Sequence, residues 1–338
     1  MKKRLVILIA AALLITSMPF YAFAEDEVPA AGGEQIGTEV SEEPVPGVVR
    51  EVEGILYYFD ASGEPEMSVG WKTAEDGIYY VSSGAVVTSP LRIAGTKTLS
   101  KKVKLYYNKK KKKWQTKKIK KAKTKYKTTY YTVKTNELYM FCKDGKLKTT
   151  KGLYPYDGNE YYGLGEGAIK TGWAAIGDNA VYFDPSTGAM AKGTTIGHLK
   201  VPESGRLGKA YALGVKQLDK SGWTLKKAYT FSYKLKYHDR WYRRKTSEDY
   251  AIKGFTKHKG NCYVMAATFY IQGKLLGYDI HQVQGHVGIW PHSWTVIKEK
   301  GKEWVYDPNF RNETGRNGWK IYYGKKGTWK YRGKHKMN

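Results

Sequence analysis

Short aromatic segments recur through the middle of the chain, each followed by a glycine. Residues 172–184 read GWAAIGDNAVYFD, and residues 70–81 read GWKTAEDGIYYV. In each copy, two strand-like runs flank a glycine-containing turn, which is typical of a β-hairpin of about 20 residues. A single hairpin cannot bury one face by itself, so neighbouring copies have to stack. We therefore expect an all-β array of stacked hairpin repeats over residues 51–195.

The aromatic motif resembles the cell-wall-binding repeats of the choline-binding and glucan-binding type, over roughly residues 52–193. In that family, the Gly-Trp tryptophan and the tyrosines of neighbouring repeats form aromatic cages for choline or sugar. Aromatic faces attract quaternary ammonium ions, so the chemistry fits such cages. The alternative is that these aromatics only fill the hairpin cores. The residues that the resemblance implies as ligand contacts are Trp71, Tyr79, Trp173 and Tyr182.

The first residues have the features of a secretory signal peptide, which we assign to residues 1–24. A basic start precedes an apolar run from Leu5 to Ile15, and an Ala-Phe-Ala cleavage site ends at Ala24. The apolar run is short for a membrane span, and an uncleaved anchor is the alternative. Residues 25–50 are acidic and rich in Gly, Pro and Val, which predicts a solvated linker. We expect a secreted protein associated with the bacterial cell wall or surface, with no transmembrane segment after signal cleavage.

A basic tract interrupts the repeats. The chain has 58 Lys and Arg against 31 Asp and Glu, a formal net charge of +27, and residues 97–127 contain 16 lysines and no acidic residue. Such a tract attracts polyanions, and its binding weakens steeply with salt. For an exported protein we expect an anionic wall polymer such as teichoic acid. Specific nucleic-acid binding and a merely solvated insert are the alternatives.

Length and cysteine count limit the remaining possibilities. At 338 residues the chain is long enough for two or three domains, and we assign the last to residues 200–338. Two cysteines exclude a disulfide-dense scaffold and a Cys-rich zinc or iron–sulfur protein. Cys142 occupies the aspartate position of a repeat, whereas Cys262 lies in the last predicted domain. A disulfide between them is the alternative to a functional Cys262 thiol.

Cys262 lies at the predicted start of a buried helix. Gly260 and Asn261 give a turn-and-cap signal, and the apolar run after them ends near Gly277. A helix N-terminus stabilises a thiolate. The backbone N–H of the cysteine can also point at a developing oxyanion. Cys262 is therefore a candidate nucleophile.

His292 and Asp307 are predicted to meet across a hairpin. Residues 292–297 alternate as a strand, residues 299–302 form a turn, and the returning strand ends before Pro308. Pairing of Glu299 with Lys302 places His292 diagonally across from Asp307 on the same face. These two residues would be the base and its orienting carboxylate in a Cys-His-Asp triad.

The ordered set of motifs in residues 254–310 resembles the transglutaminase-like superfamily. The resemblance implies an α+β papain-like fold, with the nucleophile helix packed on an antiparallel sheet. It also implies a cysteine peptidase, an amidase or a protein-glutamine acyltransferase that works through a thioester on peptide or glutamine amide bonds. The residues that carry the resemblance are Gly260, Cys262, Ala266, Gly277, Gly285, His292, Trp294, Trp304, Asp307 and Pro308.

Several roles stay open at the level of sequence. The alternative function is a non-catalytic surface-binding protein that uses the repeats and the basic tract to bind wall polymers. No metal or cofactor is expected, although a zinc site of three histidines is an alternative. His281 and His286 are alternative catalytic bases, and the zinc site would combine them with His292. The second donor to the oxyanion could be Trp241, Tyr242 or His258.

Overall fold

The computed structural model describes residues 47–239 and 246–337. The chain divides into two compact units. Unit 1 comprises the described residues up to Gly152 together with Gly163–Ile169, and unit 2 comprises Leu153–Tyr162 and the residues from Lys170 onwards. The last Gly-Trp hairpin therefore shares a unit with the helices, whereas the sequence-based boundary near residue 200 separates them. The predicted signal peptide and most of the predicted linker lie outside the described residues.

Unit 1 begins with small antiparallel sheets. Strand β1 (Val48–Val52) pairs with β2 (Ile55–Phe59), and β3 (Gly70–Ala74), β4 (Gly77–Ser82) and β5 (Ala85–Val86) form a second sheet. The expectation of a linker up to residue 50 is therefore wrong at its end. The alternating segment from Val48 joins a hairpin because its partner strand follows after a two-residue turn. Tyr58, Tyr79 and Val81 are among the residues that fill the core between these sheets.

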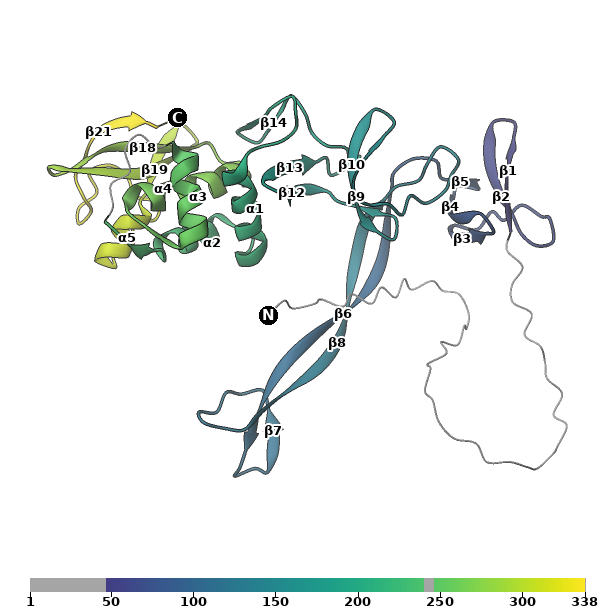
Figure 1. Cartoon of the computed structure of the whole chain (residues 1–338), viewed down its shortest axis with the longest axis horizontal. Helices are drawn as coiled ribbons and strands as arrows, with labels where there is room; N and C mark the ends of the chain where they lie inside the picture. Colours follow the sequence, from purple (N-terminus) through teal and green to yellow (C-terminus); the bar gives the residue numbers. More distant parts are fainter. Residues whose placement is uncertain (1–46, 240–245, 338) are drawn as a thin grey trace. The chain divides into compact units, whose positions relative to one another are not determined.

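The basic tract forms the end of a long hairpin (Figure 1). Strand β6 (Leu91–Asn108) pairs with β8 (Thr124–Tyr139) from Leu91↔Tyr139 to Tyr106↔Thr124. Between them, β7 (Lys113–Gln115) folds back on the end of β6, and β11 (Ala168–Ile169) pairs with the base of β8. The ordered element is thus longer than the lysine-rich insert.

Six further short strands form hairpins, and the last four of them belong to unit 2. The division between the units falls within β9 (Lys151–Tyr156) and β10 (Asn159–Gly165). Strand β12 (Gly172–Ile176) pairs with β13 (Asn179–Phe183), and β14 (Thr194–Ile196) pairs with β15 (Leu199–Val201). Buried residues of β12, β13 and β15 share one core with the helices, so the last hairpins and the helical part fold as one body.

The rest of unit 2 combines helices with an antiparallel sheet. Helices α1 (Lys209–Ser221), α2 (Leu225–Tyr233) and α3 (Ser247–Lys257) surround α4 (Cys262–Leu275), and α5 (Pro308–Thr314) packs on α2 and α4. The sheet has the order β20 (Lys302–Tyr306), β19 (Trp290–Glu299), β18 (Ile280–Val287), β21 (Tyr331–Lys336), and α4 packs on β18 and β19. Two short strands, β16 (Lys236–Tyr237) and β17 (Lys259–Gly260), pair in parallel.

Gly254 allows α3 to approach α4 closely. A Cβ atom at this position would lie 2.2 Å from Cγ2 of Thr268 in α4. Almost every residue of α4 is buried, as the apolar sequence predicts. In the described part of the chain, no helix is long and apolar enough to cross a membrane.

Candidate catalytic site

Cys262 is the first residue of α4. Asn261 caps the helix, because its side-chain oxygen accepts a hydrogen bond from Val264 N at 3.3 Å. The N–H groups in the first turn of a helix lack partners within the helix, so they point outward at a site beside the Cys262 thiol. The thiol is reduced, and the residue is 8% exposed. This arrangement places the Cys262 thiol at the positive end of the most buried of the described helices.

His292 and Asp307 meet across the β19–β20 hairpin. Glu299 pairs with Lys302, the register expected from the sequence. Nε2 of His292 lies 2.8 Å from Oδ2 of Asp307, and both side chains are buried. Because Nε2 faces the carboxylate, Nδ1 is the ring nitrogen left for Cys262, whose side chain is one of the groups that raise the pKa of the imidazole.

Three donors hold the Asp307 carboxylate. Besides His292, Phe310 N donates to Oδ1 at 2.9 Å and the Tyr331 hydroxyl donates to Oδ2 at 3.0 Å. The first of these makes Asp307 the N-cap of α5, and Pro308 at the next position favours the start of that helix. A fully buried carboxylate requires such partners, because burying an unpaired charge is very costly.

Charge and hydrogen bonding favour the protonated form of His292. Burial lowers the pKa of the imidazole, but the charge and hydrogen bond of Asp307, together with Cys262, outweigh burial and raise the pKa to about 10. The imidazole is thus positioned to carry a proton next to the thiol. A protonated imidazole beside Cys262 is the geometry in which a thiolate is stabilised.

Aromatic side chains enclose the imidazole. Trp329 meets the ring of His292 edge-on at 4.9 Å, and Trp294 stacks on it at 5.9 Å. The Trp294 indole donates to the Tyr323 hydroxyl at 2.9 Å. Neither Trp329 nor Tyr331 was singled out by the sequence motifs, since both lie beyond the motif region and reach the site through β21. The one sequence signal for them is the spacing of two aromatic residues: Trp329 lies two positions before Tyr331, which begins β21.

The alternative histidines lie in other surroundings. Nε2 of His281 lies 3.0 Å from Oδ1 of Asp279, and burial lowers the pKa of His281. His286 is exposed and pairs with Pro291 and Arg332 along the sheet. Within residues 47–239 and 246–337, no group of three potential ligands could hold a metal ion, so the three-histidine zinc site is not assembled there.

The other sequence-based candidates are placed as follows. Cys142 is also reduced and lies in unit 1, so it forms no disulfide with Cys262. Its backbone makes the same pair of turn hydrogen bonds as that of Asp60 in the first repeat, donating to the carbonyl four residues on and accepting from the N–H three residues on. His258 ends α3 in the left-handed conformation and meets the Phe231 ring edge-on. Trp241 and Tyr242 lie outside the described residues.

A second aromatic site lies elsewhere in unit 2. Trp173 and Tyr182 are directly opposite each other in β12 and β13, and their rings meet edge-on at 5.0 Å. They line a pocket of about 260 Å³ together with Asp219, in the last turn of α1, and Trp223, just after that helix. The Trp223 indole donates to the Asp219 carboxylate at 2.9 Å. The structure therefore adds Trp223 and Asp219 to the residues that the repeat motif indicated.

In unit 1, the two residues indicated as ligand contacts, Trp71 and Tyr79, do not face each other. Trp71 lies opposite Tyr80 rather than Tyr79, and the two rings are 5.1 Å apart. Tyr79 points to the other face, is 1% exposed and donates its hydroxyl to Asp76. Neighbouring strand residues face opposite sides of a sheet, so Tyr79 fills the core and offers no surface to a ligand. The turn between Ala74 and Gly77 fixes this register and could have identified Tyr80.

Comparison with known proteins gives matches among solved structures alone. No protein-family model matches the chain, and no curated protein does. Choline binding protein F from Streptococcus pneumoniae is 24% identical over 49% of this chain and 48% of its own, with a TM-score of 0.19. The choline binding domain of Spr1274 from the same species is 27% identical over 21% of this chain and 82% of its own, with a TM-score of 0.18.

A third similar structure is the multimodular pneumococcal cell wall endolysin from phage Cp-1, which was solved in complex with choline. It is 15% identical over 46% of this chain and 33% of its own, with a TM-score of 0.25. The match thus spans about half the length of choline binding protein F and a third of the endolysin.

Proposed function

We propose that unit 2 is a cysteine-dependent acyl-transfer enzyme that cleaves or exchanges peptide or glutamine amide bonds. The observation that supports this is the buried 2.8 Å contact between His292 Nε2 and Asp307 Oδ2, with Cys262, at the start of α4, among the groups that raise the pKa of the imidazole. Nucleophile, base and orienting carboxylate are then joined in one chain of contacts. The resemblance of this ordered set to transglutaminase-like proteins belongs to the same proposal.

The first half of the reaction forms a thioester. In the resting ion pair Nδ1 of His292 carries the proton of the thiol, and the Cys262 thiolate sulfur attacks the amide carbonyl carbon. First-turn N–H groups of α4 face the developing oxyanion. The C–N bond then breaks as His292 returns its proton to the departing amine. Asp307 keeps Nε2 protonated and stabilises the imidazolium throughout.

The second half releases the acyl group. His292 takes a proton from water or from an acceptor amine, which attacks the thioester carbonyl. The C–S bond breaks, and the sulfur is again the partner of the imidazolium. Water gives hydrolysis, and an amine gives transamidation. The enclosure of His292 by Trp329 and Trp294 reduces the access of bulk water to the imidazole.

Trapping of the acyl-enzyme tests this proposal. The mature chain is incubated with peptide amides and glutamine-containing peptides, and hydroxylamine captures the thioester as a hydroxamate. We expect hydroxamate from the wild type and from Cys142→Ala, which serves as the matched control, and none from Cys262→Ala. Hydroxamate formation by Cys262→Ala would exclude Cys262 as the nucleophile.

A second function is supported by the aromatic pocket of unit 2. Trp173, Tyr182 and Trp223 surround a space beside the Asp219 carboxylate, a combination that suits an organic cation or a sugar ring. The similar structures include choline-binding proteins, and for this chain we propose binding of a wall polymer through this pocket. If Cys262 proves unreactive, this binding is the function that stays, and the protein is a non-catalytic surface-binding protein.

Competition distinguishes the possible ligands of the aromatic pocket. The mature chain is bound to purified cell walls and washed with choline or with wall sugars at constant ionic strength. We expect release by one of them, and loss of wall binding in Trp223→Ala. Release by salt alone, with Trp223→Ala unaffected, would argue against an aromatic ligand site.

A further inference from the structure

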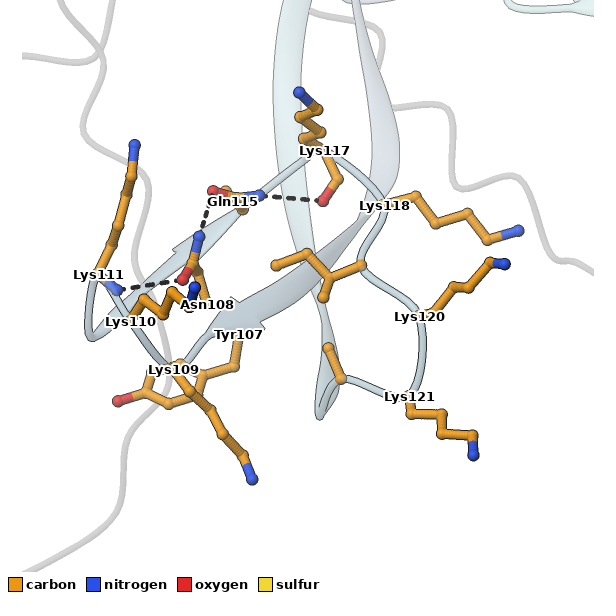
Figure 2. A pocket seen from close by; sticks show the side chains of 12 residues that line it. Tyr107, Asn108, Lys109, Lys110, Lys111, Gln115, Lys117, Lys118, Lys120 and Lys121 are labelled. Atoms are coloured by element: carbon orange, nitrogen blue, oxygen red, sulfur yellow. Dashed lines mark hydrogen bonds between the residues drawn. The ribbon is translucent and has the colours of Figure 1, made fainter.

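The end of the β6–β8 hairpin contains a hollow lined by lysines, which Figure 2 shows. Its volume is about 610 Å³, within the range of small-ligand sites. We call residues 107–122 the lysine tip. The residues that line the hollow are Tyr107, Asn108, Lys109, Lys110, Lys111, Gln115, Lys117, Lys118, Ile119, Lys120, Lys121 and Ala122.

Neutral amides, rather than carboxylates, fix the two loops of the lysine tip. Asn108 Oδ1 accepts from Lys111 N at 3.1 Å, and Asn108 Nδ2 donates to Gln115 Oε1 at 3.4 Å. Gln115 Nε2 in turn donates to the Lys117 carbonyl at 3.3 Å. The loops are therefore ordered without consuming any of the positive charge around the hollow.

The positive charge of the tract is almost unneutralised. In the described part of the chain, the one ion pair formed by a lysine of residues 97–127 joins Lys97 to Glu137 at 3.5 Å. Lys125 lies over the Trp114 ring at 4.5 Å, which orients it without cancelling its charge. These uncompensated like charges repel one another and destabilise the hairpin. A bound polyanion would reduce this repulsion.

The side-chain chemistry suits phosphates on a flexible chain. Residues 97–127 contain 16 lysines and no arginine. Arginine binds carboxylates and phosphates with a rigid two-pronged fork, whereas lysine is a compact point charge on a flexible stem and is widely used to bind phosphate. Ile119 and Ala122 add apolar surface to the hollow, which suits a ligand with carbon between its phosphates.

The shape of the element favours a thin, flexible polymer. The paired part of the hairpin comprises sixteen residues of β6, from Leu91 to Tyr106, which is about 50 Å at the rise of a β-strand. Such an arm can enter a polymer layer. The hollow at its end can admit a single flexible chain, whereas a nucleic-acid duplex presents its phosphates on a wide convex surface and cannot enter it.

We propose that the lysine tip binds a linear polyol phosphate, a flexible chain with one phosphodiester charge per repeat. The phosphates would pair with lysines on both loops of the hollow, and the polyol carbons would contact Ile119 and Ala122. This site is separate from the Cys262 site and from the aromatic pocket of unit 2. The proposal extends the sequence-based expectation of a polyanion partner to a defined place and a defined chemistry.

Binding of a synthetic glycerol-phosphate oligomer to the mature full-length chain tests the proposal. The tip variant replaces Lys117, Lys118, Lys120 and Lys121 with Gln. The matched control, the stem variant, replaces four exposed lysines in the paired part of β6 and β8 with Gln: Lys101, Lys102, Lys127 and Lys134. Both variants lose four positive charges. We expect the tip variant to bind at least about tenfold more weakly and its salt slope to fall by about 3, the value for four lost phosphate contacts. The stem variant should lose less than about threefold at the same salt.

Each other outcome would overturn the proposal. Equal losses in both variants would mean that the hairpin acts through total charge without a site at the tip. Equally tight binding of poly-glutamate or of single-stranded DNA of the same charge would exclude selectivity for polyol phosphate. Absence of binding by the wild type would exclude the partner itself. The thermal midpoint of the tip variant, expected to be no lower than that of the wild type, and its hydroxamate formation, expected to be unchanged, separate this test from that of the catalytic proposal.

Discussion

Asp307 is the residue on which the candidate catalytic site depends most. Its carboxylate accepts from the His292 ring, from the Tyr331 hydroxyl and from the first turn of α5. Its carbonyl oxygen accepts from the Tyr229 hydroxyl at 2.9 Å. One buried side chain therefore joins the sheet, two helices and the imidazole, and a change in any of these contacts should be felt at His292.

Tyr331→Phe should destabilise the protein and impair the site. The substitution removes one of the donors to a fully buried carboxylate, which costs about 1–3 kcal/mol when the acceptor is left unsatisfied. The free energy of unfolding in urea measures the loss. Tyr322→Phe is the matched control, because Tyr322 is 56% exposed, and it should change stability by less than about 0.5 kcal/mol. Equal effects of the two substitutions would contradict the role given to Tyr331.

The pKa of His292 predicts how stability depends on pH. The folded pKa is raised to about 10, whereas an unfolded histidine titrates near 6.5. The stabilisation from the protonated imidazole is therefore complete below pH 6.5 and disappears as pH rises to 10. The difference in unfolding free energy between wild type and His292→Gln should shrink steadily over that range. A difference that grows with pH would mean that His292 is neutral in the folded protein.

At the scale of elements, the start of α4 positions the nucleophile. Asn261 is the N-cap, and Cys262 follows it directly. Asn261→Ala should cost about 0.5–2 kcal/mol, because the side-chain oxygen that accepts from Val264 N is lost. Asn261→Ser retains a capping oxygen and should lose only a few tenths of a kcal/mol. Chemical denaturation of the two variants measures this, and a smaller loss for alanine than for serine would rule out the cap.

The elements also show why part of the site could be predicted. Residues joined by a tight turn have a register fixed by the sequence between them, so Glu299 and Lys302 sufficed to bring His292 near Asp307. Tyr331 could not be found in this way. It reaches the site through β21, which joins β18 with a register shift between Gln284 and His286. Such an irregularity depends on packing of the whole sheet rather than on local pattern.

The repeats illustrate the same limit on a smaller scale. The hairpins and their turns follow from glycine and aromatic spacing, and the structure contains them as small antiparallel sheets. The family motif indicated Tyr79 as a ligand contact, whereas strand pairing puts Tyr80 opposite Trp71. The contribution of Asp219 and Trp223 to the Trp173 pocket was also beyond the sequence, because it requires the end of α1 to pack beside a distant hairpin.

At the scale of the whole molecule, binding and chemistry are assigned to different surfaces. In the proposals above, the aromatic pocket and the lysine tip hold ligands and Cys262 performs the reaction. Cys262→Ala should therefore abolish hydroxamate formation while wall binding changes by less than about twofold, since the substitution removes one buried sulfur and no net charge. Sedimentation of the protein with purified walls measures the second quantity. Loss of wall binding in Cys262→Ala would show that the sites are not independent.

The central claim is that Cys262 and His292 form an ion pair, and alkylation tests it most directly. The rate of Cys262 modification by iodoacetamide is followed from pH 5 to pH 9 by peptide mass spectrometry, with Cys142 as the internal reference, in the wild type and in His292→Gln. We predict that Cys262 of the wild type reacts readily at pH 5–6, where an ordinary thiol with a pKa near 8.5 does not. His292→Gln should lose this reactivity at low pH. Parallel pH profiles of Cys262 and Cys142 in both proteins would contradict the ion pair and leave the protein as a wall-binding module.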